Sequence, residues 1–283
     1  MVHFILLFTN IPEEYRTLEV EGYPTIQAGH DDFVRRGEYE IEAIRKARHV
    51  IGRTDWDEAC TQKINPEAQY YFCHEILRET FYRHIGEWQY DGCEKHSIFV
   101  SQADYPIKGL HYLLKAMPEI LRSYPNAHIY ASGSNPMEPD SFGNVRPYGQ
   151  YLSRLTEENH LKERITFLGL LNEEEMLAQY KRANAMVSAS SIENSSNSVH
   201  EAVLVGCPVV ASYVGGTDSF LSVGKNGYLY QHDAEYMLAY YIQKIFAQRE
   251  FPFGCEAVQR LAQGMENAEA LFAIYSTVMK TMR

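Results

Sequence analysis

Residues 187–216 read VSASSIENSSNSVHEAVLVGCPVVASYVGG. The apolar run at 185–189 predicts a buried strand, and the small polar loop behind it predicts the start of a helix. A glycine and a proline end that helix, and a second apolar strand follows. Two carboxylates, Glu193 and Glu201, bracket the junction of loop and helix. Free backbone N–H groups at a helix start attract phosphate, and carboxylates accept hydrogen bonds from hydroxyls, so the stretch suits a sugar nucleotide.

Strand-like and helical patterns alternate regularly from Ser97 onward. Such alternation predicts β-α-β units, and therefore an α/β fold with a parallel sheet and helices on both faces. Because ligands of such sheets bind at the carboxyl ends of the strands, the candidate binding loops follow residues 101, 131, 189 and 211. The predicted strands are 97–101, 127–131, 165–168, 185–189, 208–211 and 227–230, and the predicted helices are 109–123, 148–160, 173–182, 197–205 and 233–248.

The amino-terminal third is less regular. Residues 11–35 contain several glycines and prolines and are expected to be irregular, and a helix is predicted at 36–50. Thr54 is the predicted N-cap of a helix at 55–63. The apolar start, Met1–Phe8, is too short to cross a membrane and is expected to be a core strand.

Charge and cysteine content exclude several classes of protein. The chain has 283 residues and a formal net charge of −11, whereas a nucleic-acid-binding protein needs a basic stripe to neutralise phosphates. No stretch is apolar for long enough to span a bilayer, so at most peripheral membrane contact is expected. The five cysteines lack paired metal-ligand spacing and are interpreted as reduced thiols of a cytoplasmic protein. They are Cys60, Cys73, Cys93, Cys207 and Cys255.

Five blocks follow one another in a distinctive order and spacing. They are Ile98–Gln102 with Ile107–Leu110, then Ile129–Gly133, Ile165–Gly169, Glu193-x7-Glu201 with the Gly-Cys-Pro and Val-Gly-Gly that follow it, and Asn226–Tyr230. Together they resemble the donor-binding half of the retaining GT-B glycosyltransferases of family 4. The resemblance implies a GT-B type α/β fold, in which a Rossmann-like donor domain with a parallel sheet accompanies an acceptor-side domain.

The resemblance also suggests how the chain is divided. Ala47–Asp55 resembles the end of the family's acceptor-side domain, and Ala270–Tyr275 resembles the terminal helix that crosses back to it. The implied limits are 1–92 for a residual acceptor-side N-terminal domain and linker, 93–250 for the donor domain, and 251–283 for a helical arm. Most of the acceptor-side domain is expected to be missing, and a separate N-terminal domain partner is one way to supply it.

By the same resemblance, Glu201 accepts hydrogen bonds from the ribose of the donor. Glu193 lies beside the donor sugar and the charge that develops at its anomeric carbon. Lys108, at a helix start, neutralises the departing diphosphate, so Glu193 and Lys108 are the candidate catalytic residues. For each charged side chain the alternative is a solvated surface role. The candidate donor-binding residues are Glu201, Gln102, Gly133, Asn194, Ser195, Ser196, Asn197, Ser198, Gly215 and Gly216.

Position 102 departs from the family pattern. Many members carry an arginine about six residues before the lysine, and Gln102 stands there in this chain. Glutamine donates hydrogen bonds but adds no positive charge, which weakens the expected hold on the diphosphate. The backbone of 194–198 is expected to bind sugar and diphosphate, although helix capping explains serine and asparagine there equally well. Glycines at 133 and 215–216 allow close approach of a ligand, as they also allow ordinary turns.

No metal and no cofactor are expected. Asp55-Trp-Asp57 spells the Asp-x-Asp signature of metal-dependent glycosyltransferases, but it falls at a predicted helix start outside the donor half. Acids in a first helical turn are what the helix dipole favours. The expected donor substrate is a nucleotide diphosphate sugar, with a UDP- or GDP-sugar preferred.

These expectations combine into one function. The chain is expected to be a metal-independent, hexosyltransferase-like enzyme that moves a sugar to a glycan or lipid-linked acceptor with retention of configuration. Polysaccharide or glycoconjugate biosynthesis is the expected setting. Two alternatives stay open: a non-catalytic or partner-dependent nucleotide-sugar-binding module, and a GT-B sugar-nucleotide epimerase.

Overall fold

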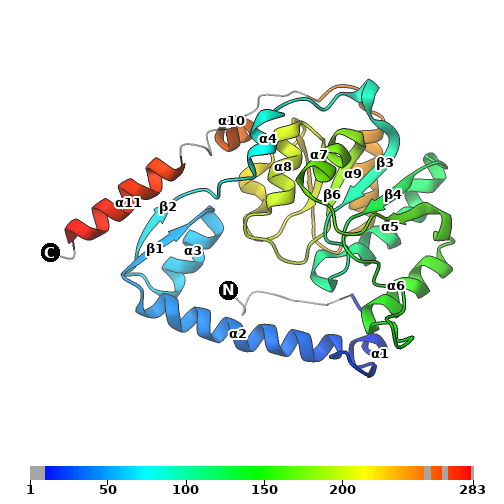
Figure 1. Cartoon of the computed structure of the whole chain (residues 1–283), viewed down its shortest axis with the longest axis horizontal. Coiled ribbons are helices and arrows are strands. Elements are labelled where there is room, and N and C mark those ends of the chain that lie inside the picture. Colours follow the sequence, from blue (N-terminus) through cyan, green and yellow to red (C-terminus); the bar gives the residue numbers. More distant parts are fainter. Residues whose placement is uncertain (1–9, 252–255, 263–266, 282–283) are drawn as a thin grey trace.

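A six-stranded parallel sheet organises the computed structural model, which describes residues 10–251, 256–262 and 267–281 (Figure 1). The strands lie in the order β5-β4-β3-β6-β7-β8. They are β3 (Glu94–Val100), β4 (His128–Ala131), β5 (Ile165–Phe167), β6 (Ala183–Ser188), β7 (Val209–Ser212) and β8 (Gly227–Tyr230). The helices between them are α5 (Leu110–Ser123), α6 (Pro147–Glu158), α7 (Glu173–Arg182), α8 (Asn197–Val205) and α9 (Glu235–Phe246). The predicted α/β class with a parallel sheet is confirmed.

The strand order creates a switch point. From β3 the chain adds β4 and β5 on one side, then returns and adds β6, β7 and β8 on the other. Neighbouring strands β3 and β6 therefore send their following loops in opposite directions. The crevice outside their carboxyl ends is the usual ligand site of such doubly wound sheets.

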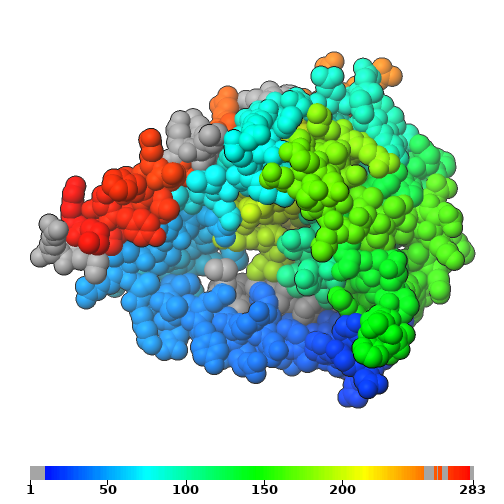
Figure 2. Space-filling model, in the orientation of Figure 1, coloured from blue at the N-terminus to red at the C-terminus, as the bar shows by residue number. Residues whose placement is uncertain are grey.

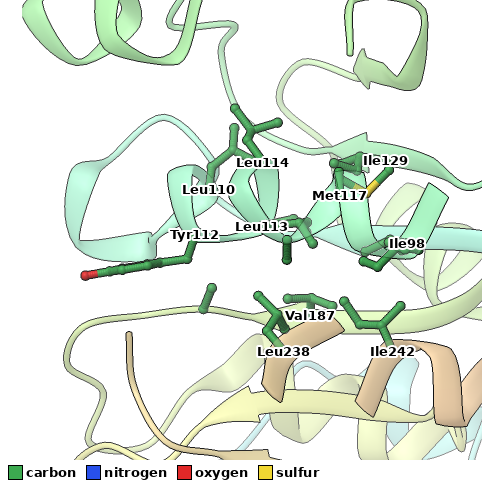
Figure 3. Close-up of a cluster of buried hydrophobic side chains, with 14 of the residues drawn as sticks. Ile98, Leu110, Tyr112, Leu113, Leu114, Met117, Ile129, Val187, Leu238 and Ile242 are labelled. Carbon is green, nitrogen blue, oxygen red and sulfur yellow. The ribbon is translucent and has the colours of Figure 1, made fainter. Parts of the chain in front are cut away.

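Both faces of the sheet are buried. Along β3, Ile98 and Val100 face one apolar cluster while Phe99 faces the other, as the two-residue period of a strand requires. Helices α5 and α9 cover the first face, where Leu113 and Ile242 meet the sheet (Figure 3). Helices α7 and α8 cover the second. Fixed packing on both faces holds the loops at the switch point in place.

All six predicted strands and the five helices between them are present, with ends shifted by a few residues. The largest strand shift is at β3, which begins at Glu94 rather than residue 97. Its first three residues are polar and partly exposed, and the pairing with β6 is irregular there. Apolar patterning therefore gave no sign of the extra residues.

The amino-terminal part departs from its prediction. Residues 11–35 are not irregular, because α1 (Glu13–Arg16) and the long α2 (Ile26–Lys46) occupy most of that range. Thr25 caps α2 by accepting a hydrogen bond from the Ala28 N–H. The prediction placed the helix start ten residues too late because Gly29 was taken as a break, whereas a long helix tolerates a glycine at a modest cost.

A small second sheet follows α2. It pairs β1 (His49–Gly52) with β2 (Gln69–Phe72) in parallel, with α3 (Asp55–Ile64) between them. Thr54 and Asp57 form a capping box at the start of α3, which confirms the predicted N-cap. The six-stranded sheet and its covering helices are here called the main unit. Helix α1 packs against α6 of this unit, where the Tyr15 and Tyr151 rings lie 5.2 Å apart.

Residues 73–93, here called the linker, join the two sheets. They contain α4 (Glu79–Arg83) and are more ordered than predicted. Leu77, Phe81 and Trp88 are buried in the second apolar cluster, and the Trp88 indole donates to the Ala183 carbonyl at 2.7 Å. The linker is therefore part of the main unit's core.

The predicted carboxy-terminal helical segment contains α10 (Glu256–Ala262) and α11 (Asn267–Thr281). The Cys73 thiol lies 3.8 Å from the carbonyl of Asn267, so α11 begins beside the end of β2 (Figure 1). The start of α2 packs on the main unit, since Ile26 is buried in the first apolar cluster, and Figure 2 shows a hollow above the middle of this helix. Within the described ranges, no helix has the length and apolar character needed to cross a bilayer. The expected strand at Met1–Phe8 lies outside the described residues, and the proposed domain limits stay predictions.

Candidate functional site

A cavity of about 590 Å³ opens at the switch point between β3 and β6. Loops after β3, β4 and β6 and the amino end of α8 form its floor, and the linker closes one side. We call it the switch-point cavity. Its lining residues are Ile76, Leu77, Arg78, Ser101, Gln102, Asp104, Tyr105, Lys108, Ser132, Gly133, Leu170, Leu171, Met176, Glu193, Ser195, Ser196, Asn197, Ser198 and Glu201.

Most of the predicted site residues meet in this cavity. They are Lys108, Gln102, Gly133, Glu193, Ser195, Ser196, Asn197, Ser198 and Glu201. Asn194, Gly215 and Gly216 are not among the lining residues. Residues that are 85 positions apart in the chain thus share one wall, because the carboxyl ends of neighbouring parallel strands lie together.

Lys108 and Glu193 form an ion pair across the cavity floor. The Nζ–Oε2 distance is 2.8 Å, and both side chains are mostly buried. Lys108 ends a 3-10 turn that follows β3, and Glu193 lies in the loop after β6. A hydrogen bond from the Ser191 N–H to the Ile107 carbonyl, 2.8 Å long, joins the two loops. The floor therefore carries one cation and one anion in fixed proximity.

Gly109 explains how the two loops approach so closely. Its φ of 75° lies in the left-handed region, and a Cβ atom there would lie 1.9 Å from the Ala189 carbonyl oxygen. Any side chain would push apart the ends of β6 and α5. Glycine at this position is thus a condition for the Lys108–Glu193 pair.

The amino end of α8 has no side-chain cap. Ser196 occupies the N-cap position, but its hydroxyl lies 3.1 Å from that of Ser198 instead of capping the backbone. The first turn holds no acid, and the buried Ser195 hydroxyl has no hydrogen-bond partner in the described part of the chain. Helices α3 and α7, in contrast, both begin with complete capping boxes. The α8 terminus thus offers backbone N–H groups and a partial positive charge to an anion in the cavity.

Glu201 lies deeper, in the second turn of α8, with a side chain only 4% exposed. Arg78 donates from Nε and Nη2 to its carboxylate at 2.9–3.0 Å, and the Tyr180 hydroxyl donates to Oε2 at 3.1 Å. Burial raises the pKa of Glu201, and the nearby Arg78 guanidinium acts in the opposite direction. The carboxylate is buried and paired, and it is not a solvated surface group.

Asn194 connects the site loop to the small sheet. Its amide donates to Asp57 at 2.9 Å and accepts from the Thr54 hydroxyl at 2.7 Å. The Tyr70 hydroxyl also donates to Asp57. Asp57 of the Asp-x-Asp sequence is therefore engaged in capping and in loop anchoring. Within the described residues, no group of three or more His, Cys, Asp or Glu side chains is placed to hold a metal ion.

Gly215 and Gly216 pack against the backbone of the loop that carries Glu193 and Asn194. A Cβ atom on Gly215 would lie 1.9 Å from the Glu193 carbonyl oxygen, and the Gly216 N–H donates to that oxygen at 3.1 Å. The close approach made by these glycines is to the loop backbone. Gly133, with φ of 103°, does line the cavity and donates its N–H to the Gly169 carbonyl at 2.9 Å.

Gln102 lines the cavity with an unusual backbone. Its φ of 53° places a non-glycine residue in the left-handed region, which costs about 1–3 kcal/mol unless the surroundings enforce it. Its N–H lies 3.4 Å from the Ser132 hydroxyl oxygen. The turn places the residue after β3 at the cavity wall, so position 102 offers a neutral amide and not a cation.

Sequence reasoning missed the contribution of the linker and of α7. Arg78 lies in a region without clear periodicity, and Tyr180 looks like an ordinary core aromatic of an amphipathic helix. The only signal was indirect: a carboxylate predicted at a buried helix position needs a counter-charge, and sequence spacing does not say which arginine supplies it.

Comparison with known proteins agrees with this geometry. A family model described as Glycosyl transferases group 1 matches residues 94–248, more than half of the chain. An uncharacterized glycosyltransferase of Methanocaldococcus jannaschii is 33% identical over 134 residues, which are 47% of this chain and 31% of that protein. The chain thus spans about a third of the length of this curated relative.

Two solved structures show the same fold. Sucrose-phosphate synthase from Thermosynechococcus elongatus superposes with a TM-score of 0.68 at 22% identity, covering 87% of this chain and 62% of that one. Anabaena HepE in complex with UDP-glucose gives 0.68 at 18% identity, covering 86% and 67%. The architecture is that of GT-B glycosyltransferases. Because the family model covers more than half of the chain, the chain belongs to the glycosyl transferases group 1 family.

Proposed function

We propose that this chain binds a nucleotide diphosphate sugar in the switch-point cavity and transfers the sugar to an acceptor with retention of configuration and without a metal ion. The uncapped amino end of α8, with Lys108 and two carboxylates around it, is the observation that carries the proposal. It offers anion binding and hydroxyl binding side by side, which are the two needs of a sugar nucleotide.

The diphosphate is assigned to the α8 terminus and Lys108. N–H groups of the first helical turn donate to phosphate oxygens, and the Lys108 ammonium adds a charge-assisted hydrogen bond. In the structure this ammonium is paired with Glu193 at 2.8 Å. Donor binding therefore exchanges a carboxylate partner for a phosphate partner, and the ammonium stays paired.

The hydroxyl groups of the donor are assigned to the two acids. Glu201 lies one and a half turns inside α8, so it reaches the ribose when the diphosphate caps the helix. Glu193 lies before the helix, on the side of the transferred sugar. This arrangement orders base, ribose, diphosphate and sugar along the cavity from Glu201 to Glu193. A UDP- or GDP-sugar is the proposed donor, and the UDP-glucose complex of HepE supports UDP.

The proposed reaction proceeds on one face of the sugar. The bond between the anomeric carbon and the diphosphate oxygen breaks, and the acceptor oxygen bonds to the same face of that carbon. The leaving phosphate oxygen takes the acceptor's proton. Lys108 and the α8 terminus stabilise the negative charge that grows on the diphosphate, and Glu193 stabilises the positive charge at the anomeric carbon.

A second cavity marks the proposed acceptor side. It has a volume of about 360 Å³ and shares Asp104 and Tyr105 with the switch-point cavity. Pro106 and Ile107 lead directly from it to Lys108. Its wall is mainly aromatic and aliphatic and includes Phe33 of α2. We assign it to the non-reacting part of a glycan or lipid-linked acceptor, in cytoplasmic polysaccharide or glycoconjugate synthesis.

The donor assignment is tested first by ligand-dependent stability. UDP, GDP, ADP and their sugars are screened by thermal shift, since a ligand that binds only the folded state raises the melting temperature. Calorimetry then compares variants. Glu201→Ala should abolish binding of the preferred nucleotide, Glu193→Ala should lower turnover more than binding, and the exposed Glu138→Ala should change neither. Unchanged binding in both cavity variants would show that the ligand lies elsewhere.

Transfer is tested separately from binding. The chain is incubated with radiolabelled donor, with and without glycan or lipid-linked acceptors, and the products are separated. Transfer or slow hydrolysis that is lost in Lys108→Ala supports the enzyme. Tight binding with neither product would instead assign a nucleotide-sugar-binding module.

A further inference from the structure

Glu201 is a buried carboxylate whose charge needs explanation. Its side chain is only 4% exposed, and burial raises its pKa. The two hydroxyl groups of a ribose donate hydrogen bonds. An ionised carboxylate, which only accepts, is therefore their best partner. A protonated Glu201 loses acceptor capacity and presents an O–H of its own. Something in the cavity wall must hold the charged form.

Arg78 meets that need with a rigid geometry. Its Nε and Nη2 both reach the carboxylate, a charge-assisted arrangement that fixes orientation as well as charge. The guanidinium carbon also lies 4.9 Å from the ring centroid of the fully buried Phe81. The Arg78 side chain is 41% exposed, and its guanidinium is held by the pairing with Glu201 and by the contact with the Phe81 ring.

The other groups that face Glu201 do not replace this cation. Tyr180 of α7 donates one neutral hydrogen bond, and Glu173 of α7 adds a negative charge that raises the pKa of Glu201 further. Lys108, the other cation on the cavity wall, is engaged with Glu193. Arg78 is therefore the charged partner that the described structure gives to Glu201.

We propose that Arg78 is a positioning residue that keeps Glu201 charged and oriented toward the ribose. The linker thus supplies the second cation of the switch-point cavity, in a chain where position 102 is a neutral glutamine. The ribose part of this inference rests on the proposed function, whereas the control of the Glu201 charge does not.

The first test needs no ligand. Carbon-13 NMR follows the titration of glutamate carboxyl groups in the folded protein, and Glu201→Gln assigns the signal. In Arg78→Met the midpoint should move up by about one pH unit or more, the usual effect of losing an adjacent opposite charge. Arg78→Lys should restore most of the difference. Arg83→Met is the matched control, because Arg83 lies on the same short helix, is exposed and pairs with Glu79. An unmoved midpoint in Arg78→Met would overturn the proposal.

The second test measures UDP binding from pH 6 to 8.5. Arg78→Met should weaken binding most at pH 6, where Glu201 is most protonated, with affinity recovering as the pH rises and Glu201 ionises. The double variant R78M/E201Q should bind no worse than E201Q alone and show no such recovery. Tighter binding by R78M would make Arg78 a competitor of the ribose and contradict the proposal, as would an equal loss at every pH.

Failure of nucleotide binding and failure of the Arg78 role are distinguishable. If wild-type protein binds no nucleotide, the proposed function fails while the carboxyl titration still decides the role of Arg78. If R78M does not fold, R78M/E201Q removes both charges and should recover the fold, because an unpaired buried carboxylate is then the cause. A double variant that also fails to fold would count against the proposal.

Discussion

Lys108 and Glu193 form an ion pair in the cavity, and this pairing determines the expected effect of removing the lysine. In Lys108→Met the diphosphate meets an unpaired Glu193 carboxylate and lacks its cation. Hydrogen bonds between charged groups contribute about 1.5–3 kcal/mol, so UDP affinity should fall roughly 10- to 150-fold. Uridine, which has no phosphate, should bind as before. Calorimetric titrations of both ligands check this, and an equal loss for uridine would place Lys108 away from the diphosphate.

A glycine-to-alanine substitution should lower the free energy of unfolding at Gly109 and raise it at Gly29. Gly109→Ala forces a Cβ atom to within 1.9 Å of a backbone oxygen at a φ of 75°, and should destabilise the fold by about 2–4 kcal/mol. Gly29 lies inside α2, and a Cβ atom added there would meet nothing within 4 Å, so Gly29→Ala should stabilise by about 0.5–1 kcal/mol. Urea unfolding of the two variants measures both; equal effects would show that φ and close contact at Gly109 do not matter.

Helices and strands that depend on a local pattern of apolar residues could be predicted from the sequence. The strands from Ile98 to Tyr230 are mostly apolar runs, and most of the helices between them carry one apolar stripe, although Val199–Val205 of α8 are all buried. Helix α2 was mispredicted because its first half presents few core positions: only Ile26 and Gly37 are buried along its length. A helix exposed on most sides leaves little periodic signal.

Only the site residues in loops directly after a predicted strand could be predicted from the sequence. Loops after β3, β4 and β6 could be located because strand ends in a doubly wound sheet converge. Arg78 and Tyr180 reach Glu201 from elements 123 and 21 positions away, respectively. Their places depend on how the linker packs, and no local pattern encodes that. Likewise Gly215 and Gly216 were assigned to a ligand, but their close contact is with the backbone at Glu193 and Asn194.

The N-cap residue of α3, Thr54, contributes both to the stability of the fold and to the position of the loop that carries Glu193. Thr54→Ala removes a cap and also a hydrogen bond to Asn194, whereas Thr25→Ala removes only the cap of α2. Thr25→Ala should lose about 1 kcal/mol of unfolding free energy, and Thr54→Ala should lose more, because a second hydrogen bond of a buried side chain is lost as well. Only Thr54→Ala should also weaken UDP binding, because it frees the loop that carries Glu193. Denaturation and calorimetry measure the two effects. If both variants bound UDP equally well, the contact between the small sheet and the site loop would have no influence on the ligand.

Buried histidines on both faces of the main sheet make the whole fold sensitive to acid. His111 of α5 lies on one side and His200 of α8 on the other, each almost fully buried. Burial lowers the pKa of His200 from 6.5 to about 3 and lowers that of His111 well below 6.5. Both stay neutral in the folded state and take up protons on unfolding. The stability they contribute is complete above pH 6.5 and is lost as the pH falls toward their folded pKa values.

This sign sets the expected pH profile. Between pH 7.5 and 5.5 each of these two histidines should cost about 1.4 kcal/mol of unfolding free energy, because the imidazole takes up its proton in the unfolded chain and stays neutral in the folded one. Glu201 acts in the opposite direction, because its folded pKa is raised and its burial is relieved by protonation. Partial neutralisation of the net charge of −11 also favours the folded state.

Comparison of variants separates these contributions. His200→Phe keeps a ring against Phe220, 3.8 Å away between centroids, and should remove the loss of about 1.4 kcal/mol that belongs to His200, since that protonation site is gone. The exposed His160→Asn should leave the profile unchanged. Urea unfolding at pH 7.5, 6.5 and 5.5 measures the slopes. An unaltered slope in His200→Phe would mean that His200 takes up no proton on unfolding, and the acid sensitivity would then belong to other groups.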